Sequence, residues 1–273
     1  MSITSSSINE TFAFFAKNAK VSFIEEEVID IDFNLKKIFL SNRPSVNYSK
    51  LVLNYGSQTK IPKVFESLVK NRNAFSIKPF LRAYESILKE DIFDSVNELP
   101  FVIVGSGLAA IEVSYALRKR WRHRSLKLLC DSRKINNTII KSLRNSNIDL
   151  IENLNFDYGK ILLCTGNTSP LWAQKKLLDL DSHGRIITNQ NLQLKSFSGI
   201  FAVGDCAVID SAKRPASGVF AVKVVNTLVQ NLKKDIEGGL LKKWFPQRIG
   251  LQIVNIFPSC LLYTSPSPRD DEL

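Results

Sequence analysis

Cysteine and histidine are both scarce in this chain of 273 residues, which contains only four cysteines and two histidines. No two cysteines stand in the C-x-x-C spacing that zinc sites and dithiol redox centres use, so we expect neither a metal site nor dithiol chemistry. Two histidines also argue against a histidine-based metal centre and a hydrolase triad. The residues concerned are Cys130, Cys164, Cys206, Cys260, His123 and His183.

Long apolar runs are missing as well. No run approaches the roughly 20 apolar residues that a membrane span requires. The first residues, MSITSSSINETF, lack the basic stretch and apolar block of a secretory signal. The sequence therefore predicts no membrane span and a reducing, cytoplasmic setting. Hydrophobic residues make up 44% of the chain and charged residues 23%, which excludes a disordered tail and indicates one large globular domain or two ordinary ones.

The last residues differ in composition from the Lys/Asn/Ile-rich chain before them. Residues 260–273 read CLLYTSPSPRDDEL, which looks like the translation of an adapter used in sequencing libraries. A Ser/Pro-rich flexible tail is the alternative. We interpret residues 259–273 as a tail derived from such an adapter, and we expect the natural chain to continue beyond Pro258 as part of a longer protein.

Hydrophobic periodicity and turn residues predict mixed α/β structure. From Leu99 a short apolar run, a glycine turn, a helix pattern and a second apolar run follow one another, which is typical of a βαβ unit with parallel strands. We expect helices at 8–19, 78–90, 136–146 and 217–236. We expect strands at 21–32, 36–41, 50–57, 126–131, 148–151 and 160–164 and strand-like runs within 185–205, with the first two strands forming a meander.

The strongest local signal is the run Gly105-Ser106-Gly107-Leu108-Ala109-Ala110, a G-x-G-x-x-A between a strand and a helix. Gly105 permits the tight turn, Gly107 lets a pyrophosphate approach the backbone, and Ala110 lets helix and strand pack closely. The N–H groups at the start of the helix then present a partial positive charge to the phosphates. This context favours a dinucleotide site, and a merely structural glycine turn is the alternative.

An acidic residue closes the second strand of this unit. Asp131 stands 26 residues after Gly105, slightly later than the usual spacing of about 20. A carboxylate there can bond both ribose hydroxyls of NADH, whereas Arg133 and Lys134 close by could instead receive the 2′-phosphate of NADPH. Asp131 therefore favours NADH as the cofactor, while Arg133 and Lys134 keep NADPH as an alternative.

A cluster of cations ends the predicted helix of this unit. Nucleic-acid binding is one interpretation. We favour another, in which cations at a helix C-terminus oppose the macrodipole and stay solvated. We therefore expect no nucleic-acid partner, and we expect Trp121 to be a packing residue. The cluster consists of Arg118, Lys119, Arg120, Arg122 and Arg124.

A second glycine-bearing strand end lies in residues 199–207, GIFAVGDCA. An apolar strand there runs into Gly204 and Asp205, which places a carboxylate at a strand end beside a residue that lets a ligand come close. Asp205 could accept hydrogen bonds from a polyol such as a ribityl chain. A strand-ending Gly-Asp is also a common turn, so periodicity alone leaves both interpretations open.

Three segments in this order, GSGLAAIE, ILLCTG and GIFAVGDCA, resemble the two-dinucleotide-binding-domain flavoproteins, the FAD-dependent pyridine nucleotide-disulfide oxidoreductase superfamily. Within it the chain is similar to the NADH dehydrogenase-like branch found fused to selenide, water dikinase. That similarity lies in RPSVNYSKLVLNYGSQT, SIKPFLRAYESI, RPASGVFAVKVVNTL and KKWFPQRIGLQ. The resemblance implies an α/β fold with Rossmann-like parallel sheets and a β-meander, FAD and NAD(P)H as cofactors, and hydride transfer from nicotinamide to flavin and on to a quinone or other acceptor.

The resemblance also implies roles for particular residues. Glu112 would be the catalytic residue near nicotinamide and flavin, Asp205 would bond the ribityl group, and Val28 would approach the adenine through its backbone. The fingerprint, the segments that return the chain to the flavin domain and the segment beside the isoalloxazine would make the other cofactor contacts. These are Tyr55, Gly56, Ser57, Gly105, Gly107, Ala110, Asp131, Thr165, Gly166, Gly204, Ala216, Gly218 and Val219.

The chain departs from the superfamily pattern in several places. The first glycine fingerprint, which binds the ADP half of FAD, should lie upstream of Met1, so we expect the chain to hold FAD poorly. The stretch between Ile151 and Lys160 is too short for the β-meander of a nicotinamide domain. Cys164 and Cys206 are interpreted as buried small apolar residues.

These departures set the expected domain organisation. We expect a partial FAD-binding domain at 1–97 and 165–258, interrupted by a shortened NAD(P)H-binding domain at 98–164. The dikinase part is missing, and a fused or associated dikinase domain is a possible partner beside the small-molecule acceptor. The alternative function is a non-catalytic nucleotide-binding or regulatory domain of such a fusion, which the shortened nicotinamide domain supports.

Overall fold

The computed structural model describes residues 5–174, 178–247, 252–256 and 260–264 of the chain. Contacts divide the chain into two compact units, each built from segments far apart in the sequence. The predicted assignment of ranges to cofactor-binding domains stays a prediction. Unit 1 comprises Met1–Tyr55, Ser169–Lys213 and Ala221–Phe245, and unit 2 comprises Gly56–Thr168, Arg214–Phe220 and Pro246–Leu273.

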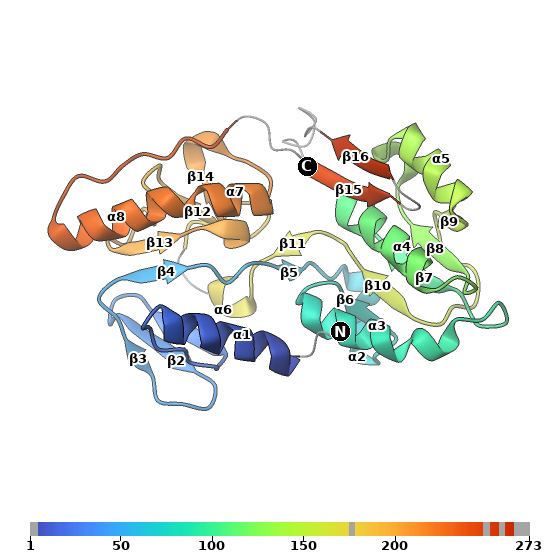
Figure 1. The fold of residues 1–273 in the computed structure, drawn as a ribbon, viewed down its shortest axis with the longest axis horizontal. Coiled ribbons are helices and arrows are strands. Elements are labelled where there is room, and N and C mark those ends of the chain that lie inside the picture. The colour runs from blue at the N-terminus through green and yellow to red at the C-terminus, as the bar shows by residue number, and fades with distance from the viewer. Residues whose placement is uncertain (1–4, 175–177, 248–251, 257–259, 265–273) are drawn as a thin grey trace. The chain divides into compact units, whose positions relative to one another are not determined.

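A five-stranded parallel sheet forms the centre of unit 2, with the strand order β6-β10-β7-β8-β9 (Figure 1). Every neighbouring pair in it is parallel. The expected βαβ unit is confirmed, because β7, α4 and β8 follow one another and the two strands pair side by side. The strands are β6 Ala74–Ser76, β7 Phe101–Val104, β8 Leu126–Leu129, β9 Ile148–Ile151 and β10 Ile161–Leu163.

Both faces of this sheet are buried, which explains why β7 is apolar at all four positions. Phe101 and Ile103 point into a core that α3, α4 and α5 share. Val102 and Val104 point the other way, into a second core with α2 and the segment after β9. The helices of this unit are α2 Glu66–Lys70, α3 Phe80–Lys89, α4 Leu108–Arg120 and α5 Asn137–Asn145.

Two short antiparallel ladders complete unit 2. Strand β5 (Gln58–Thr59) pairs with β11 (Asn167–Thr168), and β15 (Gln252–Ile256) pairs with β16 (Cys260–Thr264). Residues 152–160 contain no strand, so the expected absence of a β-meander between β9 and β10 is confirmed. Most of the tail predicted at 259–273 lies outside the described residues, and its adapter origin stays a prediction.

Unit 1 contains the predicted meander and two parallel strand pairs. Strands β1, β2 and β3 form an antiparallel sheet, while β4 pairs with β13 and β12 pairs with β14. The strands are β1 Val28–Asp32, β2 Lys37–Leu40, β3 Val46–Asn47, β4 Leu51–Leu53, β12 Ile186–Thr188, β13 Ile200–Ala202 and β14 Ala207–Ile209. The helices are α1 Ser5–Asn18, α6 Leu171–Gln174 and α8 Val225–Glu237, with α7 Gly218–Lys223 shared between the units.

Three predicted elements differ in extent from the structure. The strand predicted at 21–32 begins only at Val28, because the acidic run before it disfavours strand pairing. The strand predicted at 50–57 is limited to Leu51–Leu53, since the chain turns at Gly56, which has a φ of +73°. The helix predicted at 217–236 consists of two consecutive helices, which only Val224 separates.

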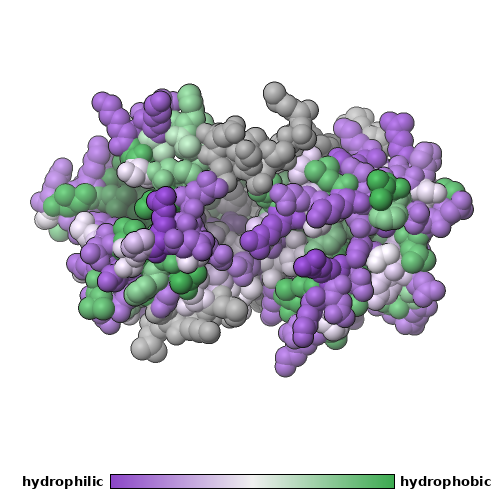
Figure 2. All heavy atoms as spheres, turned by 90° about the horizontal axis from the view of Figure 1, so that it is seen from below, coloured by the Kyte–Doolittle hydropathy of each residue, from purple (hydrophilic) through white to green (hydrophobic). Residues whose placement is uncertain are grey.

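None of the helices in the described ranges is both long enough and apolar enough to cross a membrane. On the face shown in Figure 2, hydrophilic side chains predominate and hydrophobic ones are scattered among them. Some apolar side chains at the expected helical spacing stay exposed on α1, such as Phe12 at 56% and Phe15 at 61%. The amphipathic pattern there predicted the helix correctly without predicting burial.

Candidate functional site

The first glycine of the fingerprint turn is fixed by close packing. Gly105 has a φ of +148°, a conformation that side chains other than glycine rarely adopt. A Cβ at this position would lie 2.4 Å from the carbonyl oxygen of Cys164, at the end of β10, and 3.1 Å from Cβ of Ala110. Ala110 itself is fully buried. The turn therefore holds β7, β10 and α4 together, as the predicted roles of Gly105 and Ala110 require.

The second glycine faces open space at the start of α4. Gly107 is the N-cap residue of this helix, and no atom lies within 4 Å of the place where its Cβ would stand. No side chain caps the helix, and the N–H groups of Ala110 and Ile111 donate to the Gly107 carbonyl at 3.0 and 3.3 Å. The N–H groups of Leu108 and Ala109 are therefore the donors that this helix start offers to a ligand. An open backbone turn, a helix dipole and uncapped donors fit the pyrophosphate of a dinucleotide.

The turn lies where the strand order of the sheet reverses. From β7 the chain proceeds through β8 to β9 on one side, and β10 lies on the other side of β7. Ligands of open α/β sheets bind outside the carboxyl ends of the strands at such a switch point. The fingerprint therefore stands at the position in the sheet where a nucleotide site is expected.

Asp131 is tied to both the fingerprint and a neighbouring cation. Its backbone N–H donates to the Ser106 hydroxyl at 2.9 Å, which joins the end of β8 to the glycine turn. Its carboxylate accepts from Arg133, with Nε at 2.9 Å from Oδ1 and Nη2 at 3.1 Å from Oδ2. The Arg133 hydrogen bond lowers the pKa of Asp131. The two residues weighed as alternatives for cofactor choice are thus bound to each other.

This pairing predicts a change of cofactor preference in the variant Asp131→Ala. The substitution removes the proposed partner of the ribose hydroxyls and frees the Arg133 guanidinium for a 2′-phosphate. We expect the ratio of NADH to NADPH affinity to fall by about tenfold, which titration of each nucleotide against the purified chain measures. The variant Asp149→Ala changes the same charge at the other end of the sheet and should leave the ratio unchanged. An unaltered ratio in Asp131→Ala would contradict this role.

The two segments predicted to link the domains run side by side in unit 2. The β5–β11 ladder pairs them, and the Lys60 N–H donates to the Gly166 carbonyl at 3.0 Å. The Thr165 hydroxyl donates to the Lys60 carbonyl. The Lys78 ammonium donates to the Ser57 hydroxyl at 2.7 Å. Sequence reasoning used Lys78 only as the start of a helix, so its contact with a predicted cofactor residue was missed.

In unit 1 the second predicted site gathers at the carboxyl ends of β4 and β13. Gly204 has a φ of +74°, which favours glycine, and a Cβ there would lie 2.3 Å from Oδ1 of Asn54, so the Asn54 side chain would have to move. Asp205 follows at partial exposure. Tyr55 packs edge-on against Trp172, and burial raises the pKa of its hydroxyl to about 12. Because β4 and β13 are parallel, Tyr55 and Asp205 both follow the carboxyl ends of these strands and lie at the same end of the pair.

The remaining predicted contacts are distributed between the units. Val28 lies on β1 in unit 1 and packs against the same core as Tyr55. Ala216, Gly218 and Val219 lie in the segment of unit 2 where α7 begins. Glu112 is exposed on α4. The cofactor roles of these residues stay predictions.

The basic cluster after α4 differs from the expectation that it stays solvated. Arg124 is only 2% exposed, because its guanidinium binds Glu90 at 3.0 Å and lies over the rings of Phe101 and Trp121. Arg118 donates to backbone carbonyls, while Arg122 stays exposed. Trp121 is 1% exposed, which confirms it as a packing residue.

Cys130, Cys164 and Cys206 are buried and form no disulfide with one another, and the burial of Cys164 and Cys206 confirms their interpretation. Burial raises the pKa of the Cys164 thiol to about 12 and raises that of Cys130. In the same part of the chain, no group of three or more His, Cys, Asp or Glu side chains could hold a metal ion.

Cysteine burial predicts slow alkylation of the folded protein. With a pKa of about 12, roughly one Cys164 thiol in ten thousand is ionised at pH 8, against about one in ten when unfolded. In a Cys260→Ser variant we expect a thiol reagent to label the folded chain at least about a hundredfold more slowly than the chain in urea. Rapid labelling of a thiol in the native state would contradict this burial.

Comparison with known proteins assigns the family. The family model described as L-lysine 6-monooxygenase/L-ornithine 5-monooxygenase matches residues 5–149, more than half of the chain. The chain belongs to this family. The match to the lysine/ornithine monooxygenase family spans both the meander of unit 1 and the glycine turn of unit 2, and the motifs alone did not suggest that name.

Proteins with other names are also similar to this member of the monooxygenase family. Ferroptosis suppressor protein 1 of Taeniopygia guttata is 23% identical over 273 residues, which cover 85% of this chain and 70% of that protein. Type II NADH:quinone oxidoreductase of Staphylococcus aureus is 23% identical over 272 residues, which cover 81% and 67%. An FAD-dependent pyridine nucleotide-disulphide oxidoreductase of Desulfovibrio vulgaris has the same fold, with a TM-score of 0.61 at 21% identity over 88% of this chain and 67% of its own.

These similarities confirm the expected fold class. The fold is that of the two-dinucleotide-binding-domain flavoproteins, and the sequence is similar to proteins named as a probable NADH dehydrogenase and a type II NADH:quinone oxidoreductase. The chain spans 48% to 67% of five solved chains with this fold, among them 64% of a putidaredoxin reductase. The activity of the whole protein is therefore a matter for proposal.

Proposed function

We propose that this chain is the nucleotide-binding part of an FAD-dependent NAD(P)H oxidoreductase, which passes a hydride from nicotinamide to flavin and on to a quinone or other acceptor. The observation that carries the proposal is the glycine turn, where Gly105 is locked against β10 and Gly107 is open at the uncapped start of α4. The relative named as a type II NADH:quinone oxidoreductase supports a quinone as acceptor.

The residues of this chain would mainly bind and orient the two cofactors. The N–H groups at the start of α4 would hold the pyrophosphate of the nicotinamide nucleotide. The Asp131 carboxylate would accept hydrogen bonds from the ribose hydroxyls of the same nucleotide. Asp205 would accept hydrogen bonds from the ribityl group of FAD, and Glu112 would lie near the reacting rings. Bound FAD supplies an acceptor for hydride and a donor of electrons to the quinone.

The test is NADH oxidation by the purified chain with excess FAD and a soluble quinone. Because we expect FAD to be held weakly, the excess FAD should keep the site filled and give quinone-dependent loss of NADH absorbance. An Asp205→Asn variant should show less bound-flavin absorbance near about 450 nm at the same FAD concentration. Asp210→Asn is the matched control, because Asp210 lies in the same unit and pairs with Lys195 at the surface. Binding of both cofactors without turnover would overturn the oxidoreductase proposal and favour the non-catalytic domain.

A second candidate function follows from the family assignment. The lysine/ornithine monooxygenase match favours a flavin-dependent hydroxylation of an amine, with oxygen as co-substrate. Oxygen consumption that requires L-lysine or L-ornithine would support this candidate, whereas quinone-dependent, amine-independent NADH oxidation supports the first. The same purified chain with NADH and FAD serves for both measurements.

Two finer predictions belong to the same proposal. We propose a fused or associated selenide, water dikinase domain as partner, on the resemblance of the segments quoted above, and a cytoplasmic location. The uninterrupted reading frame on both sides of this sequence tests the fusion directly. A frame without a dikinase domain would remove it and leave the oxidoreductase proposal unchanged.

A further inference from the structure

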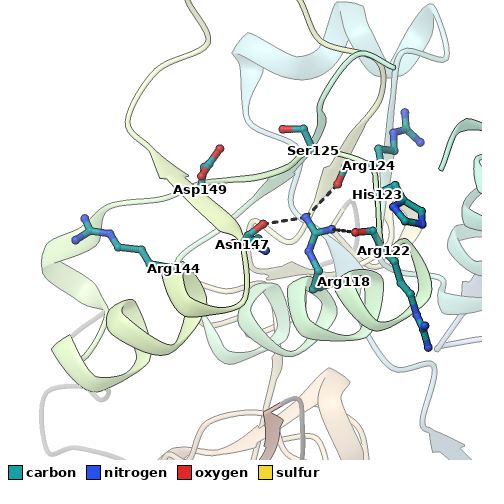
Figure 3. A pocket seen from close by; sticks show the side chains of 8 residues that line it. All are labelled: Arg118, Arg122, His123, Arg124, Ser125, Arg144, Asn147 and Asp149. Atoms are coloured by element: carbon teal, nitrogen blue, oxygen red, sulfur yellow. Dashed lines mark hydrogen bonds between the residues drawn. The ribbon is translucent and has the colours of Figure 1, made fainter. Parts of the chain in front are cut away.

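A basic pocket lies at the edge of the unit 2 sheet opposite the glycine turn (Figure 3). Ser125 and Asn147 line it and directly precede β8 and β9, so the pocket lies at the amino ends of the parallel strands. The fingerprint follows the carboxyl end of β7, and a four-residue strand spans about 13 Å. This pocket is therefore separate from the nucleotide site. Its cavity has a volume of about 310 Å³.

Arg118 binds backbone carbonyls in the segments that follow α4 and α5. Its positive charge offsets the partial negative charge of these carbonyl oxygens, which would otherwise disfavour an anion. Figure 3 shows the Arg118 guanidinium in the centre of the pocket, where it donates to the carbonyls of Asn147 at 2.8 Å and of Arg124 at 3.0 Å. It also donates to the carbonyls of Trp121 and Arg122. Carbonyls, rather than a carboxylate, occupy these donors, so the positive charge of Arg118 is retained.

The pocket stays net positive when its other charges are counted, including the Asp94 carboxylate, which accepts the backbone N–H groups of Arg122, His123 and Arg124. Glu90 balances Arg124 at 3.0 Å, and Lys127 binds the carboxylate of Asp149 at 3.0 Å. Within the described part of the chain, no ion pair engages the guanidinium groups of Arg122 and Arg144. Both side chains are exposed and can rotate toward the cavity that they line.

We propose that this pocket binds a small phosphorylated molecule through Arg122 and Arg144. The planar guanidinium group of an arginine matches two oxygens of a phosphate, and Arg118 adds a positive charge in the centre of the pocket. The Ser125 hydroxyl and the His123 imidazole line the same cavity and add donors. The volume lies at the lower end of the range for small-molecule pockets, which favours one compact ligand over the continuous basic stripe that a nucleic acid requires.

The experiment titrates the full chain with inorganic phosphate and with pyrophosphate at constant ionic strength, by calorimetry. The test variant is Arg122→Ala/Arg144→Ala. The matched control is Lys119→Ala/Lys141→Ala, which removes two exposed cations from the same region, on α4 and α5, without touching the pocket lining. We expect saturable binding that weakens at least about tenfold in the arginine variant and less than about twofold in the lysine control.

Three outcomes would overturn the proposal. Equal weakening in both double variants would mean that only the overall charge matters. Undiminished binding in the arginine variant would place the phosphate elsewhere, for example at the start of α4. Displacement of phosphate by single-stranded RNA, with a steep dependence of RNA affinity on salt, would assign the surface to nucleic acid.

Discussion

Gly105→Ala should unfold unit 2 or come close to doing so. The added methyl would stand 2.4 Å from the Cys164 carbonyl oxygen, which is backbone at the end of a central strand and has no free rotation to avoid it. A φ of +148° adds strain for any side chain. Overlap in a packed interior and backbone strain each cost about 1–3 kcal/mol, so we expect a loss of about 3–5 kcal/mol in the free energy of unfolding.

Urea unfolding followed by circular dichroism measures this loss, and Gly107→Ala is its matched control. The same methyl two residues later meets no atom within 4 Å, and Gly107 has an ordinary φ of −86°. Alanine is a poorer N-cap than glycine, so the control should lose less than about 1 kcal/mol. Equal stability of the two variants would show that the turn is looser than the structure indicates.

Glu90→Ala should cost about 3–5 kcal/mol, because it leaves the buried guanidinium of Arg124 without its counter-charge. The two side chains are 9% and 3% exposed and lie 3.0 Å apart. Arg124 also stacks over Phe101 and Trp121 in the core of the sheet, so it cannot turn to water without opening that core. Thermal or urea unfolding of the purified variant gives the value.

Two further variants separate the buried pair from a general effect of lost charge. Glu85→Ala removes an exposed carboxylate from α3 and should change stability by less than about 0.5 kcal/mol. Glu90→Ala/Arg124→Met removes both charges and should recover part of the loss, since a buried pair often exchanges for apolar side chains at little cost. A Glu90→Ala variant as stable as Glu85→Ala would contradict the burial of this pair.

The sequence predicted the glycine turn and the βαβ unit well, because the information for both is local. Gly105 and Gly107 stand between an apolar run and a helix pattern, and this order alone places them at the carboxyl end of a strand. The reason why Gly105 must be glycine is not local. It lies in the Cys164 carbonyl, 59 residues later, which strand pairing brings beside the turn.

The features that sequence reasoning missed all depend on contacts distant in sequence. Arg124 belongs to a surface-like run of cations, yet Glu90 and Phe101 bury it from another part of the chain. Asn54 lies over Gly204 only because β4 pairs with β13. The helix predicted at 217–236 is present apart from a one-residue interruption at Val224, whose backbone stays in the right-handed helical region.

The affinity of Gly107→Ala for NADH tests the central claim most directly. If the pyrophosphate lies against the start of α4, the added methyl occupies the space that it needs, and NADH affinity measured by fluorescence titration should fall at least about tenfold while the fold is retained. Gly239→Ala adds the same methyl in unit 1, in ordinary contact with Lys234, and should leave affinity unchanged. Unchanged NADH affinity in Gly107→Ala would contradict a nucleotide site at this turn.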